Sequence, residues 1–528
     1  MKNKTHFPFL EIESIPQLIK DFLAKDIEGF ETAVFNLENM KLQLEAKKNT
    51  FSAEQRAILS NTFISQYKGF ELTEFQTKNI ELLSNDNTFT VTTGHQLNLF
   101  TGPAFFIYKI LQTIKLADFL NTHFLESKVI PVFWMATEDH DFEEINHFST
   151  DKNYYEISAD SGGAVGRIKV KDTPFIAAFE EEFKDSPFGE ELIALVKKAY
   201  KEGNTLAQAT RIIVHQLFSQ YGLLVLDGDN RDLKMQMKSL FKEELLHQTV
   251  FESTKDTIDF LVGRYGKVQV NPREINLFYL TETRDRIAFE NDQFILVDKD
   301  KSFSKEELLS ALEQFPESFS PNALLRPVFQ EVVLPNLAYI GGNAEIMYWL
   351  ELKDYFAKIN IPFPILIPRA SVLVLNQKTL DKTETLGLNR DDYFRDLDQV
   401  SKELLLVDHD ILTLLNQQKN ELEQQFQKLK ESAKKTDVTF GNLVDAEKTR
   451  QLKSFKRMQK RLLRAEKIKQ SEKLNRTKNL FETVHPGNKW QERTLNFSSF
   501  YCTLGPEWLQ NCYREIRVEH SELIILPI

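Results

Sequence analysis

The chain has 528 residues and a mass of 61.5 kDa, more than one compact domain usually holds, so we expect a large core with inserted or appended modules. Apolar residues make up 42% of the chain and charged residues 27%, which excludes a disordered or fibrous protein. The net charge of −11 argues against a protein devoted to nucleic acid, because such a protein presents a basic surface.

The N-terminal segment, residues 1–85, is predicted to be helical because apolar residues such as Leu18, Ile19 and Phe22 recur at helical spacing. The first residues lack the apolar run of a signal peptide. The apolar run at 104–114 is interrupted by Lys109 and is too short to span a membrane. We therefore expect a soluble, cytoplasmic protein without a membrane partner.

Residues 86–375 are predicted to form a parallel α/β core. Short strands that are apolar on both faces alternate with apolar helices, which is the pattern of a buried parallel sheet. The predicted strands are 88–93, 129–136, 222–227 and 364–367, and the clearest helices between them are 103–119 and 206–220.

Two insertions, at about 150–205 and 230–325, are predicted to interrupt this core. Short alternating patterns at 154–170 and 267–297 are typical of antiparallel strands. In the second stretch the expected strands are 267–270, 276–280, 286–289 and 293–297. We expect each insertion to form a small antiparallel cover on the core.

The segment 376–480 is predicted to be a coiled-coil domain, and 481–528 is predicted to return to the core. From about residue 411 the chain shows heptad spacing on two long helices, so an antiparallel hairpin is expected, with its turn at 436–443 around Gly441. The apolar residues at the heptad positions form a stripe along each helix. The stripe consists of Leu412, Leu415, Leu422, Phe426 and Leu429 on the first helix and Phe455, Met458, Leu462 and Ala465 on the second. The stripe also predicts a homodimer through this hairpin.

The hairpin is locally basic. Residues 401–480 hold 19 Lys and Arg against 11 Asp and Glu, and 448–478 hold 13 against 2. We interpret this charge as the solvated face of a coiled coil, while a polyanion-binding arm stays open as the alternative. The acidic remainder of the chain makes a nucleic-acid partner the less favoured interpretation.

Polar residues follow several predicted strands, where an open parallel sheet binds its ligands. Gly102 opens the helix after the first strand, and its amide groups could hold an anion. The candidate binding residues are Thr93, Gly94, Gln96, Asn98 and Gly102 after the first strand, Asn146 after the second, Asp227 at the third, and Gly341, Gly342 and Glu345 before a later helix. Gly94 and Gly102 could instead serve turn geometry alone.

The candidate catalytic residues are His95, Glu138, Asp139, His140 and Asp141. Carboxylates and imidazoles at a strand end suit general acid–base work and the binding of a substrate amine. Arg326, Gln330 and Arg369 are candidates for binding a carboxylate or phosphate. The spacing of His140 and His147 is not that of a helical zinc pair, and the only cysteines are Cys502 and Cys512, so no metal ligand set and no zinc are expected.

Four motifs in colinear order carry a resemblance to a known family. They are TTGHQLNLFTGPAFFIYKI at 92–110, IPVFWMATEDHDFEEINH at 130–147, RPVFQEVVLPNLAYIGGNAEIMYW at 326–349, and QER at 491–493. Together they resemble the bacillithiol biosynthesis cysteine-adding enzymes, a family of cysteine ligases. The resemblance implies a Rossmann-type core with connecting-peptide insertions, a coiled-coil domain used for dimerisation, and kinship with nucleotidyltransferases such as class I aminoacyl-tRNA synthetases.

The reaction implied by the resemblance is the last step of bacillithiol biosynthesis, in which the carboxylate of cysteine joins the nitrogen of glucosaminyl malate. By position, Thr93 to Asn98 would take the place of the nucleotide cradle, and Glu138 to Asp141 that of the second-strand motif. Amide formation from a free carboxylate is uphill in water, so we expect activation by ATP and Mg²⁺ through an acyl-adenylate.

Two other functions remain open at this stage. One is a tRNA-related nucleotidyltransferase that uses the basic helix at 448–478, and the other is a non-catalytic assembly protein built around the coiled coil. Polar clusters at several strand ends favour an enzyme, because a scaffold does not need them.

Overall fold

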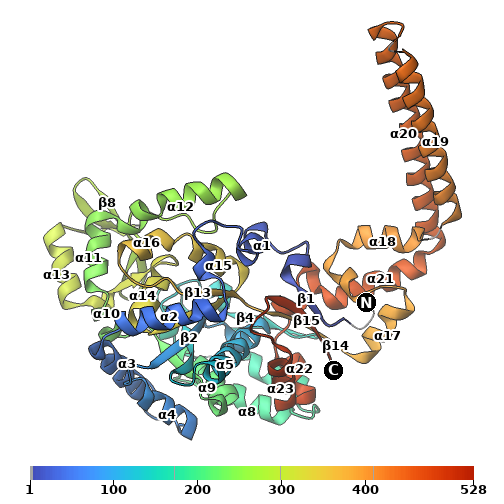
Figure 1. Cartoon of the computed structure of the whole chain (residues 1–528). Coiled ribbons are helices and arrows are strands. Elements are labelled where there is room, and N and C mark those ends of the chain that lie inside the picture. Colours follow the sequence, from blue (N-terminus) through green and yellow to red (C-terminus); the bar gives the residue numbers. More distant parts are fainter. Residues whose placement is uncertain (1–3, 172, 298, 408, 434) are drawn as a thin grey trace.

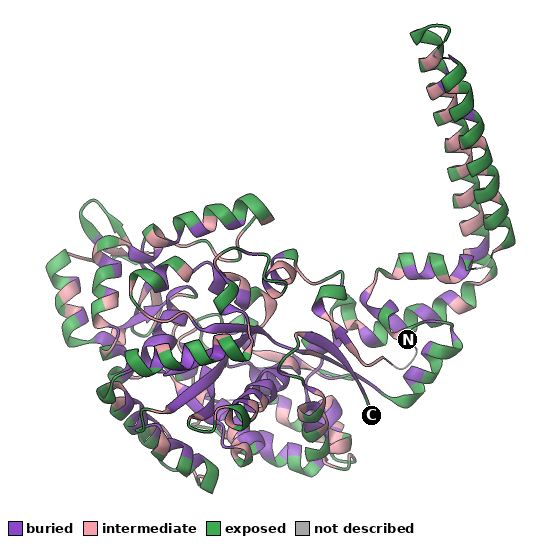
Figure 2. Ribbon diagram, in the orientation of Figure 1, coloured by how far each residue is buried: buried purple, intermediate pink, exposed green. Residues whose placement is uncertain are grey.

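The computed structural model describes residues 4–171, 173–297, 299–407, 409–433 and 435–528. These residues form a globular body and a long helical arm that projects from it (Figure 1). The strands at the centre of the body are buried, whereas the arm is largely exposed (Figure 2).

A five-stranded parallel sheet forms the centre of the body, in the order β13-β12-β2-β3-β6. Its strands are β2 (Thr88–His95), β3 (Lys128–Met135), β6 (Leu224–Asp227), β12 (Asn336–Gly341) and β13 (Ile365–Pro368). Gly94 lies opposite Trp134, and Trp134 opposite Leu226, so the carboxyl ends of three neighbouring strands meet at one edge. The predicted parallel α/β fold is confirmed.

Helices of the core follow the strands they connect. The apolar helix α5 (Phe105–His123) links β2 to β3, and α9 (Leu206–Phe218) precedes β6. The strand β12 was not predicted, because the segment NLAYIG begins with Asn and ends with Gly. The other core helices are α6 (Phe142–Ile145), α10 (Arg231–Met235), α14 (Leu325–Val333), α15 (Asn343–Leu350) and α16 (Lys353–Lys358).

The N-terminal segment is helical, as expected, except at its start. Its helices are α1 (Gln17–Leu23), α2 (Leu37–Thr50), α3 (Ala53–Gln66) and α4 (Glu74–Leu82). Before them, β1 (His6–Pro8) pairs antiparallel with β15 (Glu522–Pro527), which lies parallel to β14 (Ser371–Leu375). The prediction of an all-helical opening was therefore wrong at β1, since three residues show no helical or strand period.

The first insertion is mainly helical, not an antiparallel cover. A short pair of strands, β4 (His147–Ser149) and β5 (Tyr154–Glu156), is followed by α7 (Phe175–Phe183) and α8 (Gly189–Ala199). The expected strands beyond residue 156 do not form, because this stretch contains Gly162, Gly163 and Gly166, which weaken a strand.

The second insertion does contain an antiparallel sheet, in the order β10-β9-β8-β7-β11. Its elements are α11 (Lys238–His247), α12 (Thr249–Tyr265), β7 (Leu277–Leu280), β8 (Arg284–Glu290), β9 (Gln293–Leu296), β10 (Ser302–Phe303), α13 (Lys305–Gln314) and β11 (Phe319–Pro321). The strand predicted at 267–270 is absent. The backbone N–H groups of Gln269 and Val270 donate to the carboxylate of Glu351 instead of to a neighbouring strand.

The arm is the predicted antiparallel hairpin, formed by α19 (Asp410–Ala433) and α20 (Val438–Lys469). The predicted turn at 436–443 was too late. The helix α20 begins at Val438, because Asp437 accepts a hydrogen bond from the backbone N–H of Phe440, and Gly441 lies inside the helix. The neighbouring helices are α17 (Gln377–Thr385), α18 (Leu397–Leu406) and α21 (Ser471–Val484), and the chain ends with α22 (Ser498–Leu504), α23 (Pro506–Glu515) and β15.

Candidate functional site

A cavity of about 1390 Å³ opens at the carboxyl ends of β2 and β3, and its lining also includes Tyr339 of β12 and residues of the inserted sheet. Its wall is made by the ends of β2 and β3, by the loop 270–275, by β8 and by the helices α14 and α15. Of the predicted residues, the cavity brings together Gly94, His95, Gln96, Glu138, Asp139, His140, Arg326 and Glu345.

An ion pair between the buried Lys109 and the partly exposed Glu345 joins α5 to α15 beside this cavity. Lys109 Nζ lies 2.8 and 2.9 Å from the two carboxylate oxygens of Glu345 and donates a further hydrogen bond to the carbonyl of Gly94 at 2.6 Å. Glu345 also accepts hydrogen bonds from the hydroxyl of Tyr339 and the backbone N–H of Gly342. Burial alone would raise the pKa of Glu345, but Lys109 and Tyr339 hold this pKa down to about 2. The pair therefore stays ionised and fixes the end of β2.

His95 is a neutral imidazole. Burial, together with the positive charge of Lys109, lowers the pKa of His95 to about 3. Its ring packs against Phe105 and Phe106, with centroid distances of 5.1 and 5.5 Å, and its Nε2 has no hydrogen-bond partner among the described residues. Such an imidazole is a weak proton acceptor but can position a polar substrate group.

The acidic motif after β3 consists of Glu138, Asp139 and His140, and each of them accepts a hydrogen bond from a side chain elsewhere in the chain. Lys234 donates to Glu138 at 2.5 Å, and Gln96 donates to Asp139 at 2.8 Å. Burial raises the pKa of Glu138, although Lys234 opposes this shift. His140 receives a hydrogen bond from Arg284 at 2.9 Å. Glu138 is thus committed to an ion pair, while Asp139 lines the cavity and accepts hydrogen bonds from the neutral amides of Gln96 and the His140 backbone.

Arg326 presents a guanidinium group to the same cavity. Its Nη1 donates to Gln330 at 3.2 Å, and its guanidinium lies 5.7 Å from the centre of the Tyr339 ring. Its Nη2 is buried and has no hydrogen-bond partner among the described residues. A buried donor without a partner is costly, so this group suits an anionic oxygen of a ligand.

Two family models cover nearly the whole chain. The model described as "Bacillithiol biosynthesis BshC, N-terminal Rossmann-like domain" matches residues 7–370, and the one described as "Bacillithiol biosynthesis BshC, C-terminal coiled-coil domain" matches residues 372–528. The chain belongs to the BshC family. The resemblance seen in the four motifs and the Rossmann-type fold with a coiled coil are thereby confirmed.

Named relatives match most of the length of the chain. The chain is 41% identical to a protein of Flavobacterium johnsoniae over 97% of both chains and 42% identical to one of Flavobacterium psychrophilum over 93% of both. It is 26% identical to a protein of Bacillus cytotoxicus over 92% of this chain. Each relative carries the name "Putative cysteine ligase BshC".

Several predicted residues of this BshC chain lie away from the cavity. Thr93 is inside the sheet, where its hydroxyl donates to the carbonyl of Ile340. Arg369 forms a buried bidentate pair with Glu492, at 2.8 and 3.0 Å. The others outside the cavity wall are Asn98, Gly102, Asp141, Asn146, Asp227, Gln330, Gly341 and Gly342.

The start of α5 is not open to an anion, contrary to the expectation for Gly102. The side chain of Asn496 donates to the carbonyls of Phe100 and Gly102, and the N–H of Ala104 donates to the carbonyl of Leu495. Gly102 has a φ of +61°, and a Cβ there would lie 2.7 Å from Asn98 Cβ. Glycine is therefore required for this turn.

Sequence reasoning missed the basic residues that the insertion supplies. Arg273, Arg284 and Arg286 line the cavity, and Lys234 pairs with Glu138. The three arginines do not follow a core strand, whereas Lys234 lies on α10, directly after β6. The alternation of Arg284 and Arg286 along one strand, which places both side chains on one face, was the available signal.

Neither a metal cluster nor a membrane span is found in the parts that the structure describes. No group of three or more His, Cys, Asp and Glu side chains there is arranged to hold a metal ion. No helix among the described residues combines the length and apolar character needed to cross a bilayer.

Proposed function

We propose that this protein adds cysteine to glucosaminyl malate by forming an amide bond, as the last step of bacillithiol biosynthesis. The names of the BshC relatives support a cysteine ligase. The observation that carries the proposal is the cavity at the strand ends, which gathers carboxylates, neutral imidazoles and guanidinium groups around one space. These groups match a zwitterionic amino acid and an acceptor that carries carboxylates.

The cavity also suits an anionic activating group. The unpartnered Nη2 of Arg326 is a donor for a phosphate or carboxylate oxygen. ATP with Mg²⁺ would supply a good leaving group on the cysteine carboxylate. Arg326 would hold a phosphate oxygen of the nucleotide.

The protein's own part is to orient the amine and to accept its proton. As the glucosamine nitrogen forms a bond with the cysteinyl carbonyl carbon, the leaving group departs and the nitrogen loses a proton. Asp139 suits this acceptor role, because Gln96 and the N–H of His140 fix its carboxylate at the cavity wall, at 2.8 and 2.7 Å. Glu138 is less suited, since Lys234 neutralises it.

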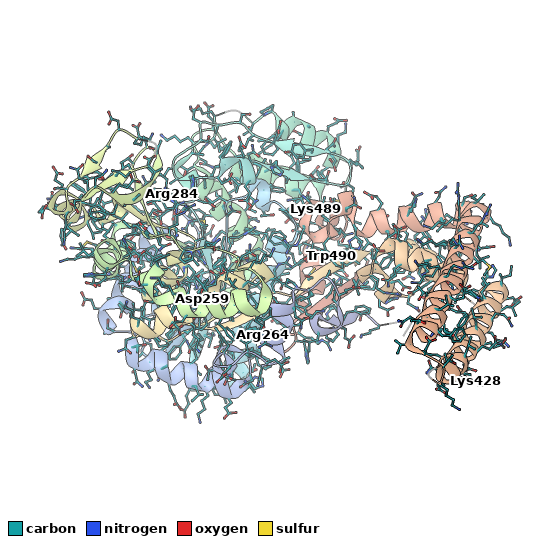
Figure 3. All side chains as sticks on the ribbon, turned by 90° about the horizontal axis from the view of Figure 1, so that it is seen from above. Asp259, Arg264, Arg284, Lys428, Lys489 and Trp490 are labelled. Atoms are coloured by element: carbon teal, nitrogen blue, oxygen red, sulfur yellow. The ribbon has the colours of Figure 1, made fainter. Side chains whose placement is uncertain are left out.

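The test is a reaction of the purified protein with cysteine, glucosaminyl malate, ATP and Mg²⁺, followed by mass spectrometry of the thiol product. We expect Asp139→Ala and His95→Ala to lose at least about 100-fold in rate, as is typical when acid–base and positioning groups are removed. Their melting temperatures should stay close to that of the wild type. The matched control is Asp259→Ala on the exposed face of α12 (Figure 3), which should keep full activity. Equal loss of fold and activity would assign Asp139 and His95 structural roles instead.

We further propose that the arm joins two copies of the chain. The residue Phe426 packs inside the hairpin with Ala433 and Val444, so the predicted stripe is partly satisfied within one chain. Other apolar residues of the arm remain exposed to water, namely Ile411 (53%), Leu414 (58%), Leu443 (61%) and Ile468 (70%). A second copy of the arm would cover them.

Light scattering should therefore give about twice the monomer mass at micromolar concentration. The double substitution Leu414→Glu and Leu443→Glu should reduce this mass, because the two carboxylates place charge on the exposed apolar surface of the arm. Leu125→Glu is the control, since Leu125 is 84% exposed on the body. A wild-type protein of monomer mass would rule the dimer out.

A further inference from the structure

We propose that Arg284, from the inserted sheet, holds His140 as a neutral imidazole with its proton on Nε2, so that His140 donates a hydrogen bond to an anionic oxygen of the bound substrate. The role toward substrate rests on the function proposed above. The protonation of His140 concerns the protein alone.

The geometry of one hydrogen bond fixes the tautomer. Arg284 Nη1 lies 2.9 Å from His140 Nδ1. A guanidinium group has donors only and keeps its charge in proteins, so Nδ1 must be the acceptor. A ring nitrogen that accepts a hydrogen bond carries no proton. The proton of the neutral ring is therefore on Nε2.

Arg284 is held firmly enough to impose this arrangement. Its Nε donates to the hydroxyl of Ser320 at 3.0 Å, and its Nη2 donates to the carbonyl of Pro321 at 2.7 Å. The ring of Phe278 lies beneath it, with 4.0 Å between the guanidinium carbon and the ring centre. All three partners belong to the inserted sheet or to its edge. Figure 3 shows Arg284 in the body, on the side remote from the arm, which Lys428 marks.

The charges around His140 shift its pKa in opposite directions, and the net shift favours the neutral imidazole. Burial and the positive charge of Arg284 lower the pKa of His140, while Asp139, Asp141 and Asp285 oppose this shift. The nearest carboxylate oxygen, on Asp139, is 3.7 Å from Nδ1, farther than Arg284. The same oxygen already accepts the backbone N–H of His140 at 2.7 Å. Asp139 therefore does not displace Arg284 from Nδ1.

His140 and Asp139 therefore have different roles in the acidic motif. His140 lines the cavity, and its Nδ1 is occupied, so the group it can offer to a ligand is the Nε2–H donor. A donor at this place would stabilise negative charge on the acyl oxygen while the amide bond forms. Arg284 acts through His140 and is a positioning residue. Asp139 remains as the proton acceptor.

The protonation state can be read from the protein without substrate. In protein containing ¹⁵N-labelled histidine, a long-range proton–nitrogen correlation at pH 7 distinguishes protonated from unprotonated ring nitrogens, and His140→Gln identifies the signals of residue 140. We expect Nδ1 to be unprotonated, Nε2 to be protonated, and the ring to titrate below the ordinary value of about 6.5. A proton on Nδ1, a mixture of tautomers, or a titration at or above the ordinary value would overturn the proposal.

Two variants then test the part played by Arg284. Arg284→Gln should raise the pKa of His140 toward its ordinary value and give a mixture of tautomers. Arg286→Gln removes the same charge from the same face of β8 and should leave the tautomer unchanged. An Arg284→Gln spectrum identical to that of the wild type would show that Arg284 does not set the tautomer. The wild-type spectrum decides the protonation even where Arg284→Gln fails to fold.

The role toward substrate is tested by the pH dependence of the ligase reaction. His140→Gln keeps an N–H donor, so it should lower kcat less than His140→Ala does, and the pH at which the rate falls should not move. If His140 were the proton acceptor, both variants would abolish that pH dependence, and this result would overturn the donor role. The labelled spectrum decides the protonation whether or not the ligase assay succeeds, so failure of the proposed function can be recognised separately.

Discussion

Replacing Lys109 by Met is expected to destabilise the protein by about 3 kcal/mol, because it leaves the carboxylate of Glu345 without its cation. This free-energy change lies at the lower end of the usual range for removing one partner of a buried ion pair, because Glu345 keeps its hydrogen bonds to Tyr339 and Gly342. The midpoint of urea unfolding measures the change. Ligase activity should fall as well, because the carbonyl of Gly94 loses its donor at the cavity edge.

The matched control for this prediction is Lys115→Met on the same helix. Lys115 lies over the ring of Tyr513, 4.3 Å from its centre, a contact worth about 0.5–1 kcal/mol. Adding Glu345→Gln to Lys109→Met should recover part of the lost stability, since the uncompensated charge is then gone. If Lys109→Met were as stable as the control, the pair would not be the structural link inferred here.

Arg326→Gln should lower kcat/KM by about 10- to 150-fold, the loss that corresponds to a charged hydrogen bond of about 1.5–3 kcal/mol. The reason is that Arg326 lines the cavity and its Nη2 has no hydrogen-bond partner among the described residues. Arg326→Lys should restore only part of the rate, because it keeps the charge but loses the planar fork. Steady-state kinetics with each substrate varied in turn gives the numbers.

The comparison for Arg326 is Arg231→Gln. Arg231 pairs with Glu317 near the surface, and its side chain is 49% exposed. We expect this variant to match the wild type in both kinetics and stability, since exposed pairs contribute about 0–1 kcal/mol. Normal kinetics in Arg326→Gln would remove Arg326 from the substrate site.

The parallel core was predictable because its strands carry a strong local signal. The residues of β2 and β3 are β-branched or apolar over six or more positions, and both strands are followed by polar residues. That signal also located Asp139 and His140 at the strand end. By contrast, β12 carries Asn336 and Gly341 at its ends, and its strand character comes from pairing with β2 and β13 on both sides.

The rest of the site could not be predicted because its partners are far apart in sequence. Arg284 contacts His140 from 144 positions away, and Lys109 contacts Glu345 from 236 positions away. In the sequence Lys109 is only an interruption of an apolar run. Its role depends on the approach of α15, which no local pattern encodes. Ion pairs of this kind follow from the packing of elements, not from their propensities.

The C-terminal segment has a consequence for synthesis of the protein on the ribosome. The loop before α5 is held by Asn496, Arg369 by Glu492, and β14 by β15. A nascent chain lacks all three partners until residues 491–528 have emerged from the exit tunnel. Up to that point the carbonyls of Phe100 and Gly102 lack the side chain of Asn496, and Arg369 lacks the carboxylate of Glu492. The loop before α5 and the segment after β13 should therefore become ordered only after residues 491–528 are available to them.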